Sequence, residues 1–122
     1  MTAPVLVTAR VPVLDAHGRQ ERRHVALVWC PREPHVVQLV FSPGPVWLLD
    51  RALLADGLHA PAGLGDVTVI PALDGPHLEV VLSPADDHDG PGERVAVVLP
   101  RAMVEGFVAR TAPVGDPEVS GR

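Results

Sequence analysis

The chain has 122 residues, of which 47% are hydrophobic but only 3% aromatic, and its formal net charge is −5. This length suits one domain with a real core and is too short for two domains. The acidic balance disfavours binding to a polyanion such as nucleic acid, and no apolar run approaches the roughly 18 to 20 residues that span a bilayer.

The N-terminal half predicts three strands. The N-terminus lacks the order of a signal peptide, so we expect a cytoplasmic protein. Apolar residues alternate with mixed neighbours over Pro4 to Leu14, which is the period of a half-buried strand. The polar segment Asp15 to Arg23 predicts a turn, and the nearly continuous apolar run His24 to Cys30 predicts a strand covered on both faces. Val36 to Phe41 is the third predicted strand.

Cys30 is the only cysteine, so no disulfide within the chain is possible. It ends an apolar run, whereas a reactive thiol needs a positively polarised and partly open setting. We therefore predict a buried structural residue and not a nucleophile. The six histidines lack the spacing of a zinc helix, and no nucleophile elbow is present. These patterns predict neither an enzyme nor a bound cofactor.

The central stretch predicts a strand, a helix, a loop and a second strand. Val46 to Leu49 form a short apolar run that stops at Asp50, whose carboxylate is suited to cap a helix. We expect a two-turn helix that Gly57 ends in a left-handed conformation. A loop from His59 to Gly65 and a strand from Val67 to Pro71 follow.

Two strands and a helix are predicted after Pro71. Asp74 and Gly75 indicate a hairpin whose returning strand is His77 to Leu82. The next segment, Ser83 to Gly92, is acidic and rich in turn formers, with a cluster at Asp86, Asp87, His88 and Asp89. The spacing of a calcium-binding loop is missing, so a solvated loop is predicted and not a metal site.

The last strand, Glu93 to Leu99, leads into a helix that begins at Pro100. Apolar residues recur on one side of that helix and predict a core-facing stripe: Met103, Val104, Phe107, Val108 and Thr111. The pattern is thus an α+β domain, residues 1–111, with a curved antiparallel sheet, helices packed on one side or end, and a flexible tail at residues 112–122.

Three blocks resemble the SsgA-like proteins of sporulating actinomycetes. The longest block comprises Trp47, Arg51, Leu53, Leu54, Gly57, Leu58, Pro61, Gly63, Gly65, Asp66, Val67 and Pro71. The second is Glu33, Pro34 and His35 before a strand that ends in Phe41, and the third is Arg101, Phe107, Arg110 and Thr111. His35 stands where the family usually has Tyr, and Ala52 stands where it usually has Asp.

This resemblance implies a fold and a function that the composition alone does not. SsgA-like proteins are similar in fold to the whirly and mitochondrial guide-RNA-binding proteins and assemble as bell-shaped homotrimers. The implied function is a non-enzymatic adaptor in sporulation-specific cell division. Such an adaptor acts at division septa, in some cases through the tubulin-like ring protein FtsZ, and influences septum placement or remodelling of the septal wall.

Two surfaces are candidates for binding. The candidate partner site is Trp47, Arg51, Leu54 and His59, because an aromatic residue and an arginine beside a short helix are typical interface anchors. The competing interpretation places Trp47 in the core with Arg51 extended over it. The alternative function is single-stranded nucleic-acid binding, suggested by the whirly-like fold and by one basic cluster: Arg19, Arg22 and Arg23.

Overall fold

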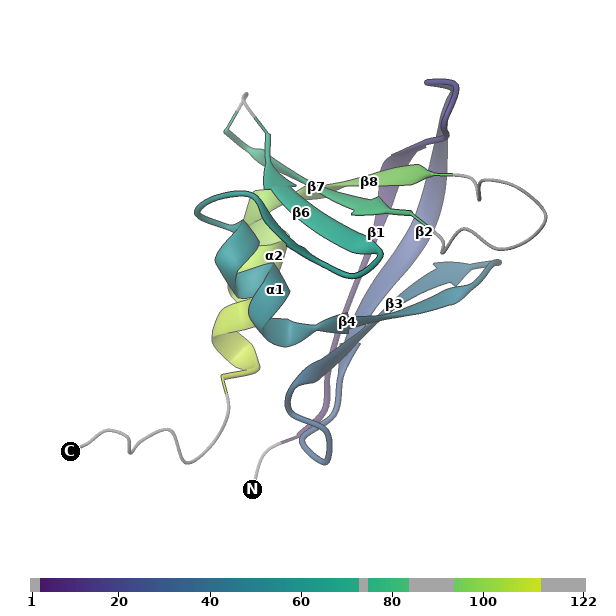
Figure 1. The fold of residues 1–122 in the computed structure, drawn as a ribbon. Helices are drawn as coiled ribbons and strands as arrows, with labels where there is room; N and C mark the ends of the chain where they lie inside the picture. The colour runs from purple at the N-terminus through teal and green to yellow at the C-terminus, as the bar shows by residue number, and fades with distance from the viewer. Residues whose placement is uncertain (1–2, 73–74, 84–93, 113–122) are drawn as a thin grey trace.

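The structure is a computed structural model that describes residues 3–72, 75–83 and 94–112. In chain order its elements are β1 (Val5–Leu14), β2 (Gln20–Trp29), β3 (Val36–Ser42), β4 (Val46–Asp50), α1 (Arg51–Gly57), β5 (Ala62–Leu64), β6 (Val67–Pro71), β7 (His77–Leu82), β8 (Val95–Pro100) and α2 (Arg101–Arg110). The strands form one antiparallel sheet in the order β4-β3-β2-β1-β8-β7-β6-β5. The sheet curls, and both helices lie on its concave side (Figure 1).

The sheet consists of two similar halves. Strands β1 to β4 form an antiparallel meander that ends in α1, and strands β5 to β8 form a second meander that ends in α2. The two halves meet where β1 pairs with β8, and that pairing joins Val13 to Val97 and Leu14 to Ala96. Both helices lie on the concave side, between the two half-sheets (Figure 1).

Strand β5 corrects the predicted strand count. Ala62, Gly63 and Leu64 were assigned to a loop, but they pair with β6 and give the second half its fourth strand. A three-residue strand that contains a glycine has little strand propensity of its own. It is held by a tight turn in which Gly65 has φ +61°.

The core lies between the helices and the concave face of the sheet. Burial alternates along the strands, so that Val25, Leu27 and Trp29 of β2 all face inward. The stripe predicted on the last helix is confirmed, because Val104 and Phe107 are fully buried and the other apolar members of the stripe pack against the core. Full burial of each large apolar side chain contributes about 1.5–3 kcal/mol relative to exposure.

Three predictions for the N-terminal half are wrong. The segment Gln20 to Arg23 belongs to β2 and not to a turn, and Cys30 is exposed and not buried. The helices cover only the concave face, so Ala26 and Val28 on the other face of β2 remain half-exposed. A strand that is apolar at every position therefore does not have to be covered on both faces.

Three predicted features fall outside the described residues. They are Asp74 of the hairpin, the acidic loop with its candidate metal cluster from residue 84 onward, and the tail from residue 113 onward.

Gly57 ends α1, but in a right-handed conformation and for a different reason from the one predicted. Its φ is not positive, and the residue is buried where α1 packs against β6. A Cβ added at this position would lie 2.2 Å from Cγ1 of Val69. The helix approaches the strand closely because the glycine has no side chain.

Replacement of Gly57 by alanine tests this close approach. We expect Gly57→Ala to lower the free energy of unfolding by about 3 kcal/mol, the upper end of the range for overpacking. The matched control is Gly106→Ala in α2, where an added Cβ meets nothing within 4 Å. That variant should gain about 0.5–1 kcal/mol from helix propensity. Urea unfolding measures both, and equal stability of the two variants would contradict this packing.

Candidate partner-binding site

The predicted partner-site residues gather where β4 passes into α1. No loop separates the two elements: the Arg51 N–H donates to the carbonyl of His35 at 2.8 Å and extends the β3–β4 ladder by one residue. Oδ1 of Asp50 accepts a hydrogen bond from the Ala52 N–H at 2.9 Å, which confirms the predicted helix cap. The direction in which α1 leaves the sheet is therefore set by β4 itself.

Arg51 joins the two helices. Its Nε donates to Oγ1 of Thr111 at 2.8 Å, and its Nη2 donates to the carbonyl of Val108 at 2.6 Å. Thr111 is fully buried and in turn donates to the carbonyl of Phe107 at 2.9 Å. A cation at the end of a helix also interacts favourably with the helix dipole. Arg51 thus holds the C-terminal end of α2 against the start of α1.

The other three predicted residues differ in how much of each reaches the surface. Leu54 is fully buried, so its side chain supports the site from the core and offers no contact area to a partner. Trp47 is half-buried and packs against the core cluster, which agrees in part with each of its two interpretations. His59, directly after α1, is exposed.

A groove of about 300 Å³ lies between α1 and β5. Its lining residues are Asp50, Ala52, Leu53, Asp56, Ala62, Gly63 and Leu64. Leu64 is 60% exposed, and the lining carries two carboxylates and no basic residue. Leu64 was missed as a lining residue because β5 was taken for a loop, and Asp56 was missed because the groove forms only where α1 meets β5. One sequence feature could have indicated this strand. Leu64 is an apolar residue between Gly63 and Gly65, and a turn alone does not require an apolar residue there.

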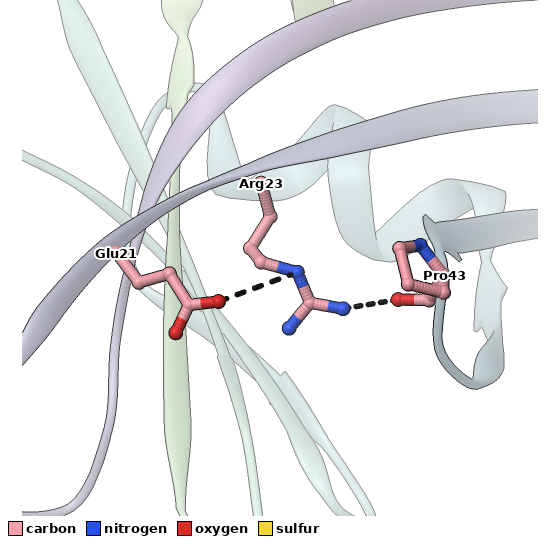
Figure 2. Close-up of polar contacts among 3 residues, drawn as sticks. All are labelled: Glu21, Arg23 and Pro43. Atoms are coloured by element: carbon pink, nitrogen blue, oxygen red, sulfur yellow. Dashed lines mark hydrogen bonds and ion pairs between the residues drawn. The ribbon is translucent and has the colours of Figure 1, made fainter.

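The basic cluster of the nucleic-acid alternative lies on the β1–β2 hairpin, and Arg23 is used inside the fold (Figure 2). Its Nη2 donates to the carbonyl of Pro43, its Nε lies 3.9 Å from a carboxylate oxygen of Glu21, and its guanidinium carbon lies 5.6 Å from the centre of the Phe41 ring. Arg22 donates to the carbonyl of Arg10 at 2.9 Å. Arg23 therefore holds the β3–β4 turn against β2.

Arg19 belongs to a turn that Asp15 organises. Oδ1 of Asp15 accepts hydrogen bonds from the N–H groups of Arg19 at 2.9 Å and His17 at 2.8 Å. The bond from Arg19 is the main cause that lowers the pKa of Asp15 from its ordinary value. A hollow of about 580 Å³ beside this turn is lined by Asp15 and Glu21 as well as Arg19 and Arg23. With equal numbers of carboxylates and guanidinium groups, it has no excess of positive charge to attract a polynucleotide.

The described residues were compared with the requirements of a metal-binding cluster and of a membrane-crossing helix. They contain no group of three or more His, Cys, Asp or Glu side chains placed to hold a metal ion. Of the two helices in the described ranges, neither has the length and apolar character needed to cross a membrane.

Comparison with known protein families identifies the family of this chain. A family described as Streptomyces sporulation and cell division protein, SsgA, matches residues 24–117. The chain belongs to this family. Its relatives include a sporulation-specific cell division protein of Frankia casuarinae, 37% identical over 76 residues, and SsgB of Saccharopolyspora erythraea, 44% identical over 61 residues. These alignments span 57% and 47% of this chain and about half of each relative, 52% and 43%.

Solved structures of the SsgA family share the fold. One concerns SsgB and longitudinal cell division during sporulation of Streptomyces coelicolor; it has a TM-score of 0.69 and 25% identity and covers 98% of both chains. An SsgA-like sporulation-specific cell division protein of Thermobifida fusca has a TM-score of 0.71 at 21% identity, covering 98% of this chain and 90% of that one. Both confirm the prediction of a curved antiparallel sheet with two helices.

Replacement of Arg51 by methionine tests its role as a bridge between the helices. We expect Arg51→Met to lower the free energy of unfolding by about 1.5–3 kcal/mol, because hydrogen bonds to the Thr111 hydroxyl and the Val108 carbonyl are lost. Arg110→Met is the control, since that exposed charge at a helix end contributes about 0.3–1 kcal/mol. Urea unfolding compares them. Equal losses would show that Arg51 has no special structural role.

A second substitution tests the assignment of Arg23 to the fold. Arg23→Met should cost about 2 kcal/mol, because it removes a charged hydrogen bond and the contact with the Phe41 ring. Arg19→Met, on the exposed turn of the same hairpin, should change stability by no more than about 0.5 kcal/mol. Thermal unfolding measures both. If Arg23→Met does not change the stability, Arg23 has no structural role and is available to bind a ligand.

Proposed function

We propose that this protein is a non-enzymatic adaptor in sporulation-specific cell division. It binds division proteins such as FtsZ and helps to place the septum or to remodel the septal wall. The observation that carries the proposal is membership of a family of sporulation and cell division proteins, together with a fold that matches SsgB over 98% of the chain. We also propose the whirly-like homotrimer and the position at cytoplasmic faces of division septa that the resemblance implies.

The partner surface in this proposal is the groove between α1 and β5 with its rim. Leu64 supplies exposed apolar area, His59 lies directly after α1, and Trp47 lies on β4, the strand that leads into α1. Asp50 already caps α1, so Asp56 is the carboxylate available to a partner. A partner segment with an apolar and a basic side chain complements this surface. Arg51 and Leu54 contribute by holding α1 in place.

Co-sedimentation with polymerised FtsZ from the host organism tests the proposal, with light scattering to measure the mass. We expect the protein to be a trimer and to pellet with the polymer. Asp56→Lys should weaken that binding at least tenfold, because it places a like charge against the basic group of the partner. Glu33→Lys is the matched control, since Glu33 is an exposed carboxylate that does not line the groove.

The outcomes separate the parts of the proposal. A trimer that stays in the supernatant overturns direct ring binding. Pelleting that is insensitive to Asp56→Lys overturns the groove as the contact surface. A mass other than that of a trimer overturns the assembly.

A further inference from the structure

The convex face of β1 to β4, which we call the outer face, is unusually apolar. Four large hydrophobic residues are exposed in the described part of the chain, and three of them lie on this face: Leu6 at 60%, Val46 at 54% and Leu48 at 65%. Both helices lie on the other side of the sheet (Figure 1). Exposed apolar groups that gather on one face, unlike scattered ones, indicate an interaction site.

Strand register places these residues in two neighbouring rows. One row crosses the four strands as Leu6, Val28, Gln38 and Leu48. The next row is Thr8, Ala26, Val40 and Val46. Side chains directly opposite one another on adjacent strands lie in contact distance. The rows therefore form a largely apolar area across the half-sheet, in which Gln38 and Thr8 are the polar members.

The same face becomes basic farther along the strands. Arg10 pairs with His24 in the third row, and the fourth row contains Arg22. The ion pairs of the described residues involve other arginines, Arg23 and Arg101, so the charges of Arg10 and Arg22 are not neutralised in this way.

Three carboxylates lie near the outer face, and none neutralises its basic end. Glu33 lines a small hollow with Val28 and Gln38, in the row of Leu6 and away from the arginines. Glu21 shares a hollow of about 490 Å³ with Arg10, Arg22, Arg23 and His24, and its one ion pair is with Arg23. Asp50 lies at the opposite end of β4, where it caps α1. The basic end thus keeps a net positive charge that a carboxylate would complement.

We propose that the outer face binds a segment of a protein partner that carries apolar side chains and, farther along, carboxylates. The row of Leu6 and the row of Arg10 are four residues apart on β1, which corresponds to about 13 Å. An extended segment covers this distance with about four residues. The apolar residues supply contact area, and charge-assisted hydrogen bonds from the arginines fix the direction of the segment.

This surface is separate from the groove between α1 and β5 and has the opposite charge preference. The inference goes beyond the proposed function, because it depends neither on FtsZ nor on a trimer. Asp56→Lys, which should disrupt ring binding, should leave binding at the outer face unchanged.

A random library of twelve-residue peptides, selected on the full chain and counter-selected on Leu48→Ser, tests the proposal. We expect the selected peptides to combine apolar residues with Asp or Glu. A representative peptide should bind at least tenfold more weakly to Leu48→Ser and to Arg10→Glu. The matched controls, Leu64→Ser and Arg110→Glu, alter an equally exposed leucine and an exposed arginine elsewhere and should bind as the unaltered protein does.

Cys30 provides a native reporter of the position. It is the only cysteine, it is exposed, and it lines a small hollow with Val28 and Gln38 at the border of the outer face. An environment-sensitive fluorophore attached to Cys30 should respond to the peptide and should not respond in Leu48→Ser. Unchanged unfolding midpoints of the variants would show that the fold is intact.

Three results would overturn the proposal. The first is a selection that yields no peptide whose binding depends on Leu48, or only peptides rich in Lys and Arg. The second is a fall in mass of Leu48→Ser by light scattering, which would assign the outer face to contacts between copies of this chain. The third is a single-stranded oligonucleotide whose binding is lost in Arg10→Glu but kept in Leu48→Ser, which would assign the basic end to nucleic acid.

Discussion

The narrow junction between β1 and β8 is the constraint on which the rest of the fold depends. Two residue pairs join the half-sheets there, whereas β1 and β2 of the first half pair over ten residues. The helices add further contacts between the halves. α1 follows the first half but packs against β6 of the second half, where Gly57 lets it approach Val69. Arg51, at the start of the same helix, binds the end of α2. One short helix thus joins both halves of the molecule.

This arrangement explains why the longest block of residues that resembles the family pattern lies around α1. Trp47, Arg51, Leu54 and Gly57 lie in or beside the segment that crosses between the half-sheets, so each affects packing in both. Of these residues, Leu54 and Gly57 are buried and Arg51 is bound to α2. A family pattern in such a segment is therefore explained first by folding. The proposed partner surface lies on what α1 leaves accessible, which is its outward face and the adjoining edge of β5.

Much of the fold could be predicted from the sequence, but less of the candidate site could be. Alternation and helical spacing located seven of the eight strands and both helices, because each of those elements has enough residues to show its period. Strand β5 has only three, and its pairing with β6 is a property of the tertiary structure. The roles of Arg51 and Gly57 depend on residues 57 and 12 positions away in sequence, Val108 and Val69, so local patterns did not reveal them. Cys30 was placed in the core because an apolar run does not indicate which of its residues lie on the uncovered face.

The proposed outer-face site places stability and recognition on different sides of one half-sheet. Side chains on the concave face are buried by the helices, and each contributes about 1.5–3 kcal/mol to folding. The apolar residues on the convex face, such as Leu6 and Leu48, remain more than half exposed and contribute little of this free energy to folding. The same free energy becomes available when another molecule covers them, although part of it is offset by the entropy lost on association. Residues of this face can therefore change the affinity for a partner with little effect on the fold, whereas the buried residues of α1 cannot be altered without loosening both halves.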